Sequence, residues 1–205
     1  MNKLFTNYNS VLSRNLSFLV VDNVFTKEEC FEIIKIGKNC EVLESKLVDG
    51  FVNNEIRNSR NSFILPEESN DWIFQKLMGA SSWVNENYFQ FDLSGFSAVQ
   101  YSEYGVGDYY DWHKDLIFNQ KDVNLENYTK QTRKLSASVF LSDRGDYLNG
   151  DLYIERDSNN NPVNTIPQSI GNMVFFPSTV DHKVSEVTDG VRASLVFWIE
   201  GPKYK

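Results

Sequence analysis

Two histidines and one aspartate are the residues of this sequence best suited to hold a transition metal. His113 and His182 are the only histidines in the chain, and Asp115 follows the first of them by two positions. Histidine is the commonest protein ligand of transition metals. The sequence around each histidine predicts a strand. Since alternate side chains of a strand share a face, His113 and Asp115 should project to one side with α carbons about 6.6 Å apart. An imidazole and a carboxylate at that spacing can converge on one ion.

His182 completes this set as a third ligand. Two histidines and one carboxylate on one face of an octahedron are the arrangement associated with non-heme Fe(II) oxygenases. A histidine two residues before an aspartate is a weak signal alone, because such pairs arise by chance and solvated histidines are common. The prediction depends instead on the order of segments, in which the His-x-Asp pair precedes two Gly-led strands, the second histidine and an arginine.

Arg192 is the second candidate for chemistry, because the segment from Val191 to Trp198 is mostly apolar and predicts a buried strand. A guanidinium in such a place needs an anion, and its planar shape suits bidentate pairing with a carboxylate. Ser194 lies two residues on, on the same face, and can donate a second hydrogen bond. The anion is either an acidic side chain of this chain or a carboxylate-bearing cosubstrate, and the sequence leaves both open.

Length, composition and charge restrict the class of protein. A chain of 205 residues with 41% hydrophobic residues suits one globular domain. The formal charge of −8 disfavours nucleic acid as a partner, because a phosphate backbone requires clustered lysine and arginine. We find no apolar core of a signal peptide and no apolar run near the roughly 20 residues that a membrane span needs. Cys30 and Cys40 are too few for a disulfide framework. We expect a soluble cytoplasmic protein without a membrane partner.

The first half of the chain predicts helices that support a later β region. Thr26 and Glu29 form a capping box at the start of one helix, and Ser69 or Asn70 can cap a second helix with apolar residues at helical spacing. We expect the helices and strands of about residues 16–92 to support, within a single domain, a β core over about residues 93–200.

Short segments rich in β-branched and aromatic residues recur in the second half, between Gly, Asn and Asp clusters. Eight such segments predict a sandwich or jelly roll. They are 96–103, 109–113, 134–142, 150–155, 163–166, 173–177, 181–187 and 191–199.

The ordered motifs resemble those of a known family. In sequence they are Gln100-Tyr101, Gly105, Tyr109-Tyr110-Asp111-Trp112-His113-Lys114-Asp115, Arg133 to Ser142, Asn149-Gly150-Asp151-Leu152-Tyr153, Gly171 to Pro177, His182-Lys183-Val184 and Gly190-Val191-Arg192. This order resembles the Fe(II)/2-oxoglutarate dioxygenases of the prolyl 4-hydroxylase type, and most of all their PKHD-type branch of bacteria and phages. The resemblance covers about residues 96–200.

This resemblance implies a mostly β fold with flanking helices, a double-stranded β-helix of the jelly-roll, cupin-like kind. It implies that His113, Asp115 and His182 bind Fe(II), and that Arg192 binds the distal carboxylate of 2-oxoglutarate. Tyr101 matches a cosubstrate-contacting tyrosine of relatives, although an aromatic core residue is the other interpretation, and Ser194 is expected to assist.

The implied reaction is hydroxylation of a C–H bond with O2, with release of succinate and carbon dioxide. Family members often use L-ascorbate to restore Fe(II), so the implied cofactors are Fe(II), 2-oxoglutarate, O2 and ascorbate. A prolyl residue of a peptide or protein is the leading substrate. Free amino acids and other small metabolites remain open, as does the oligomeric state.

Two other classes compete with the enzyme. One is a cupin-like protein that binds a metal or ligand without oxidising it, and the other is a jelly roll that serves only for attachment. Neither class explains an arginine in a buried strand, and a cupin would usually carry more histidines than two. We also expect residues 50–60 and 117–132 to act as lids over the site, since such segments often order only on binding.

Overall fold

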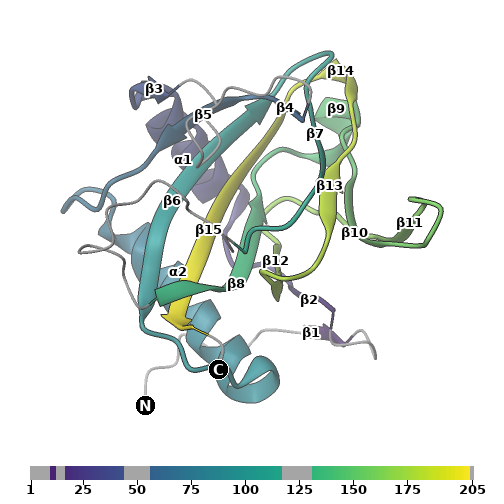
Figure 1. The fold of residues 1–205 in the computed structure, drawn as a ribbon. Helices are drawn as coiled ribbons and strands as arrows, with labels where there is room; N and C mark the ends of the chain where they lie inside the picture. Colours follow the sequence, from purple (N-terminus) through teal and green to yellow (C-terminus); the bar gives the residue numbers. More distant parts are fainter. Residues whose placement is uncertain (1–9, 13–16, 44–55, 117–130, 204–205) are drawn as a thin grey trace, which may run out of the picture.

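The computed structural model describes residues 10–12, 17–43, 56–116 and 131–203, and Figure 1 shows their arrangement. Three sheets make up most of the described part. The eight-stranded sheet runs in the order β1 (Ser10–Leu12), β2 (Leu19–Val21), β12 (Met173–Pro177), β8 (Gln131–Phe140), β15 (Arg192–Pro202), β6 (Gly95–Tyr104), β5 (Arg60–Phe63) and β3 (Val42–Leu43). The five-stranded sheet runs in the order β11 (Pro162–Thr165), β10 (Leu152–Arg156), β13 (His182–Val184), β7 (Tyr109–His113) and β4 (Arg57–Asn58). A small sheet pairs β14 (Val187–Gly190) with β9 (Tyr147–Asn149).

The helices lie on one side of the eight-stranded sheet (Figure 1). They are α1 (Lys27–Asn39), α2 (Asp71–Val84) and a π-helical turn (Asn85–Phe89) that continues α2. A separate short 3-10 turn (Arg144–Asp146) comes directly before β9. The predicted capping box of α1 is confirmed, because the Thr26 side chain accepts from the Glu29 amide at 3.2 Å and the Glu29 carboxylate accepts from the Thr26 amide at 2.8 Å. Neither α1 nor α2 is long and apolar enough to cross a membrane.

Side-chain alternation divides the interior into two cores, one on each face of the eight-stranded sheet. Along β15, Leu195 and Phe197 pack in the core beneath the helices. Ser194 and Trp198 point the other way and line a cavity between the two large sheets. This follows from the period of two along a strand. The helix-side core is apolar, so the polar residues that do not fit there gather on the inner face, where the five-stranded sheet covers them.

The predicted strands are largely confirmed, with two differences. The segment 181–187 is divided between β13 and β14, because the chain leaves one sheet for another between Val184 and Val187. The short strand β9 was not predicted. Of the two segments predicted to act as lids, residues 50–55 and 117–130 lie outside the described residues, whereas Arg57 and Asn58 form strand β4 at the edge of the five-stranded sheet.

Candidate active site

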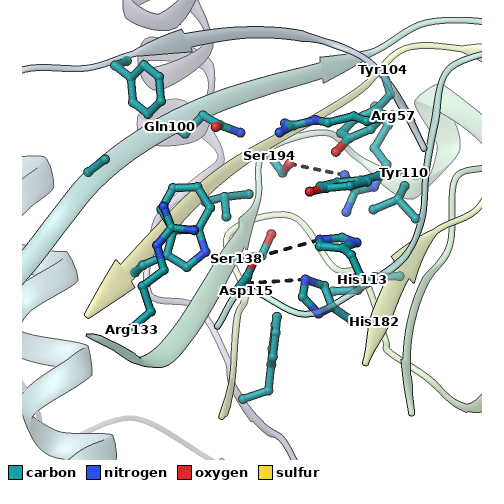
Figure 2. Close-up of a pocket in the computed structure, with 18 residues that line it drawn as sticks. Arg57, Gln100, Tyr104, Tyr110, His113, Asp115, Arg133, Ser138, His182 and Ser194 are labelled. Carbon is teal, nitrogen blue, oxygen red and sulfur yellow. Dashed lines mark hydrogen bonds and ion pairs between the residues drawn. The ribbon is translucent and has the colours of Figure 1, made fainter. Parts of the chain in front are cut away.

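The three predicted metal ligands converge on one point. Each of His113, Asp115 and His182 offers one ligand atom, and these atoms lie within 4.8 Å of one another. The Nε2 atom of His113 is 3.8 Å from Asp115 Oδ1, and the Nε2 atom of His182 is 3.5 Å from Asp115 Oδ2. Figure 2 shows both rings directed at the carboxylate. Strand pairing produces this convergence, because His113 of β7 lies directly opposite His182 of β13.

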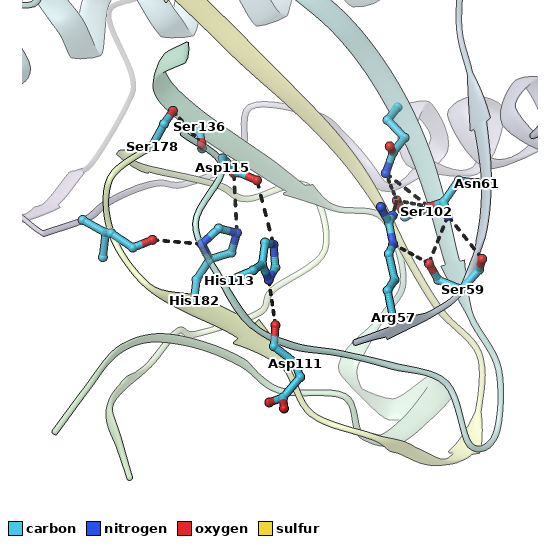
Figure 3. Close-up of polar contacts among 12 residues, drawn as sticks. Arg57, Ser59, Asn61, Ser102, Asp111, His113, Asp115, Ser136, Ser178 and His182 are labelled. Atoms are coloured by element: carbon cyan, nitrogen blue, oxygen red, sulfur yellow. Dashed lines mark hydrogen bonds and ion pairs between the residues drawn. The ribbon is translucent and has the colours of Figure 1, made fainter. Parts of the chain in front are cut away.

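Hydrogen bonds to the backbone hold both imidazoles in one orientation (Figure 3). The Nδ1 atom of His113 lies 2.7 Å from the carbonyl oxygen of Asp111, and the Nδ1 atom of His182 lies 3.1 Å from that of Val180. A carbonyl only accepts, so Nδ1 carries the proton in each neutral ring and donates it there. Nε2 then keeps its lone pair and faces the carboxylate. This tautomer is the one that a metal-binding histidine needs.

Electrostatics favour the charge states that ligate a cation. Burial and the neighbouring His182 together lower the pKa of His113 to about 3, so the ring is neutral at physiological pH. Burial alone would raise the pKa of Asp115, but the two histidines, Arg133 and a hydrogen bond from Ser136 hold it below its usual value. A neutral His113 imidazole beside an ionised carboxylate fits a divalent ion such as Fe(II).

A stack of rings supports the histidines from both sides. Tyr110 lies parallel to His113 with centroids 3.4 Å apart, and Phe176 lies 4.6 Å from the His182 ring. The Arg57 guanidinium in turn lies 4.6 Å from the Tyr110 centroid. Burial raises the pKa of Tyr110 to about 12, so its phenol is neutral. Trp112, the other aromatic residue of β7 near the histidines, points to the outer face, where Lys183 and Arg156 cover it.

Arg192 lies in the same cavity and is 2% exposed, as expected of a guanidinium in a buried strand. Its Nε donates to Gln168 Oε1 at 3.1 Å and its Nη1 to Ser194 Oγ at 3.2 Å. Within the described residues, no carboxylate forms an ion pair with Arg192. A buried cation with neutral partners alone is costly. The cavity therefore provides a place for an anion, and a carboxylate-bearing cosubstrate fits that requirement.

The structure corrects the prediction that Tyr101 contacts a cosubstrate. Tyr101 faces the helices, where its ring packs on Gly37 of α1 and its hydroxyl donates to Glu103 Oε2 at 2.8 Å. Alternation along β6 is the reason, because Gln100 and Tyr104 point into the cavity and Tyr101 lies between them.

Tyr104 is the tyrosine that faces Arg192, since the two residues are direct partners across β6 and β15. The Arg192 guanidinium carbon lies 5.3 Å from the Tyr104 ring centroid. The strand period, counted from Gln100, would have identified it from the sequence. Arg57 and Gln168 were also missed, because no local motif marks them, and Arg133 was quoted at the start of a motif without a role in the site.

Gly37→Ala is expected to destabilise the fold by about 1–3 kcal/mol, the usual cost of inserting a methyl group into a packed site. A β carbon at Gly37 would lie 2.3 Å from the Tyr101 ring, so the ring and helix must separate. The free energy of unfolding from urea titration measures this effect. Gly95→Ala is the matched control, because a β carbon there meets nothing within 4 Å. Equal stability of the two variants would contradict the packing described for Tyr101.

The architecture is a double-stranded β-helix that holds a cluster of two histidines and one carboxylate between its sheets. Two solved structures share the fold. A Pseudomonas putida prolyl-4-hydroxylase superposes with a TM-score of 0.69 and 17% identity, covering 92% of this chain and 95% of that one. A Trichoplax adhaerens prolyl hydroxylase, solved with a hypoxia inducible factor peptide fragment, gives a TM-score of 0.70 and 17% identity over 90% of this chain and 84% of that one.

Sequence comparison gives the family. Residues 99–200 match the model of the 2OG-Fe(II) oxygenase superfamily. A PKHD-type hydroxylase of Prochlorococcus marinus is 38% identical over 84 residues, which are 40% of this chain and 37% of that protein. The chain belongs to the 2OG-Fe(II) oxygenase superfamily, and the curated relatives that it resembles are PKHD-type hydroxylases. The matched segment spans less than half of the length of that curated relative.

Proposed function

We propose that this protein is an Fe(II)- and 2-oxoglutarate-dependent dioxygenase that hydroxylates a C–H bond. The observation that carries the proposal is one cavity that contains both an oriented two-histidine, one-carboxylate cluster and a buried arginine without an acidic partner among the described residues. The first group suits a divalent iron and the second a dicarboxylate. Neither the cupin-like nor the attachment alternative gives Arg192 a purpose.

His113, Asp115 and His182 hold the iron in this proposal. These three side chains would leave the ion open to the cosubstrate on the side that faces the cavity. When bound, iron and 2-oxoglutarate together supply the activation of dioxygen, with oxidation of the keto acid to succinate and carbon dioxide. The carbonyls of Asp111 and Val180 keep the Nδ1 protons of the histidines in place, so each Nε2 stays available to the ion.

Arg192 binds the distal carboxylate of 2-oxoglutarate, and the Ser194 hydroxyl donates a further hydrogen bond to the same carboxylate. Gln168 fixes the guanidinium from behind by accepting from Nε, so the Nη atoms remain directed at the cavity. Apolar residues such as Leu152, Val184 and Val196 line the same space and keep water from the cosubstrate. L-Ascorbate is the proposed reductant that returns stray Fe(III) to Fe(II).

The proposed substrate is a prolyl residue of a peptide or protein. The shared fold and the hydroxylase names of the relatives support this choice, as does the peptide bound to the Trichoplax adhaerens enzyme. Free amino acids and small metabolites are the second candidate. A proline-rich peptide library incubated with Fe(II), 2-oxoglutarate and ascorbate tests the proposal. We expect some peptides to gain the mass of one oxygen atom in step with succinate release. Succinate release without any oxygenated peptide would refute the peptide substrate and leave the small molecules.

Tyr104→Phe is expected to raise the KM for 2-oxoglutarate about three- to tenfold, the effect of losing one hydrogen bond to a charged group. Tyr104 lies opposite Arg192 and lines the same cavity, so we propose that its hydroxyl donates to the carboxylate. Tyr101→Phe removes the same atom on the far face of the strand and serves as the control. Succinate formation at varied 2-oxoglutarate measures both. A larger KM change in Tyr101→Phe than in Tyr104→Phe would reverse the assignment.

A further inference from the structure

Asp115 is the member of the metal cluster that the sheets support least. His113 and His182 lie on paired strands, and each ring is held through Nδ1 by a backbone carbonyl. Asp115 lies two residues beyond the end of β7, outside the strands. A carboxylate in such a place rotates freely unless something holds it, yet it must face both histidines to share an ion with them. Contacts from elsewhere in the fold must therefore orient it.

Ser136 of β8 contacts this carboxylate from the wall formed by the eight-stranded sheet. Its cross-strand partners are Trp198 of β15 and Phe176 of β12, and both line the cavity. Direct partners share a face, so Ser136 also points inward. The residue is fully buried and hydrogen-bonds to Asp115. A hydroxyl between two aromatic rings needs polar partners, and Asp115 is the first of them.

Ser178 is the second partner of the Ser136 hydroxyl. The two Oγ atoms lie 2.9 Å apart, and both residues are fully buried (Figure 3). The distance alone allows either hydroxyl to donate. An ionised carboxylate only accepts, so the single hydrogen of Ser136 goes to Asp115, and Ser178 must supply the hydrogen between the two serines. The hydroxyl chain therefore runs in one direction, from Ser178 through Ser136 to Asp115.

The backbone of Ser178 holds the same ligand from a second side. Its carbonyl accepts from the Leu116 amide at 2.9 Å, and Leu116 directly follows Asp115. Its amide donates to the main chain of β8 at 3.0 Å, which fixes Ser178 itself. The turn that contains Ser178 also presents the Val180 carbonyl that orients His182. One turn thus supports two of the three proposed metal ligands.

Packing alone does not require these two hydroxyls. A small residue is needed where Ser136 lies between two rings, and an alanine would fill that space without a polar atom. Serine instead brings a buried hydroxyl, which is tolerated only where it is hydrogen-bonded. Hydrogen bonds that end on a charge are the stronger ones, and successive hydroxyls polarise one another. The chain is therefore suited to hold a charged ligand and not only to fill the interior.

We propose that Ser136 and Ser178 are positioning residues for the metal, which hold the Asp115 carboxylate in the orientation that lets it share an ion with the two histidines. The inference rests on the proposed dioxygenase function, because it assigns these serines a role toward the iron of that enzyme. Partners that orient a metal ligand from behind typically affect metal affinity about ten- to a hundredfold when they are removed. The serines should therefore influence metal binding itself, before any cosubstrate or substrate is present.

Binding of Mn(II) to the apo protein tests the proposal without turnover. Free Mn(II) gives a sharp electron paramagnetic resonance signal that is lost on binding, so a titration gives the Kd. We expect Ser136→Ala to raise the Kd about tenfold, because Asp115 loses its hydrogen bond. Ser178→Ala should raise it about threefold, the effect of weakening one hydrogen bond at a distance. Ser136→Thr keeps the hydroxyl and should restore an affinity close to that of the parent.

Ser62→Ala is the matched control. Ser62 is also buried, and its hydroxyl donates to the Gly37 carbonyl at 2.7 Å on the helix side of the sheet. The variant loses a buried hydrogen bond of the same kind and should bind Mn(II) like the parent. Circular dichroism establishes that each variant is folded. Parental affinity in folded Ser136→Ala or in folded Ser178→Ala would overturn the proposal.

The double variant distinguishes a chain from two independent serines. In a chain Ser178 acts through Ser136, so its loss should add nothing once the Ser136 hydroxyl is absent. We expect the Kd of Ser136→Ala/Ser178→Ala to equal that of Ser136→Ala within about twofold, the usual limit of additivity. Multiplication of the two single effects would show that each serine acts separately and would contradict the chain.

The parent protein keeps the two hypotheses apart. Mn(II) binding by the parent that is lost in Asp115→Ala, together with an unchanged Kd in Ser136→Ala, would refute the positioning role and leave the metal site intact. Equal Mn(II) binding by the parent and Asp115→Ala would refute the metal site of the proposed dioxygenase itself.

Discussion

Asp115→Ala is expected to lower 2-oxoglutarate-dependent succinate formation by at least about a hundredfold, since loss of even an outer partner of a metal ligand costs about ten- to a hundredfold. Asp115 is the one acidic member of the cluster and lies between the Nε2 atoms of His113 and His182. Its pKa is held below the usual value, so the lost group is a charged carboxylate at neutral pH. His113→Ala and His182→Ala should have the same effect.

The fold of Asp115→Ala should survive, which distinguishes loss of the metal from loss of structure. Burial opposes the charge of this carboxylate while the two histidines and Arg133 favour it, so its removal exchanges a lost attraction for a relieved desolvation cost. Circular dichroism and a thermal melt of the apo protein should match the parent within about a few degrees. Asp189→Ala, which removes an exposed carboxylate of β14, is the control for activity. Parental succinate formation in Asp115→Ala with a bound metal would refute the assignment of the ligand.

Arg192→Met is expected to raise the KM for 2-oxoglutarate about ten- to a hundredfold, which corresponds to the loss of hydrogen bonds between charged groups. The guanidinium is 2% exposed and has neutral partners, Gln168 and Ser194, so a bound dicarboxylate gains the full ion pair. The effect should fall mainly on KM, because the distal carboxylate is remote from the reacting keto group.

Arg192→Lys is the second variant, and it separates the effect of the charge from that of the shape of the side chain. It keeps the charge and loses the planar fork, so we expect a KM between those of the parent and Arg192→Met. Initial rates at varied 2-oxoglutarate and saturating Fe(II) give both values. A KM for Arg192→Met equal to that of the parent would mean that the arginine pairs within the protein, through a residue that the described part of the chain does not include.

The cluster could be predicted from the sequence because histidine is rare in this chain and because Asp115 stands two positions after His113. The chain has two histidines, and the strand period alone places Asp115 on the side of His113. The start of α1 was equally predictable, since a capping box is local to Thr26 and Glu29. Such features depend on residues close in sequence or on residues that have few alternatives.

The rest of the cavity depends on pairings between distant strands. Tyr101 and Tyr104 are both tyrosines of β6, and the pairing of Tyr104 with Arg192 decides which of them faces the cavity. Arg133 escapes any rule of alternation, because a bulge in β8 reverses its side. Gln168 belongs to no regular element, and its contact with Arg192 spans 24 positions. These are consequences of register and packing, which no local pattern encodes.

An anaerobic absorption spectrum tests the central claim most directly. Iron that is bound by His113, Asp115 and His182 and chelated by 2-oxoglutarate should show a weak visible metal-to-ligand charge-transfer band. We expect this band to appear when Fe(II) and 2-oxoglutarate are added together to apo protein, to saturate at one iron per chain, and to be absent in His182→Ala. A colourless mixture, or an unchanged band in His182→Ala, would contradict the claim that these three side chains hold the iron beside the cosubstrate.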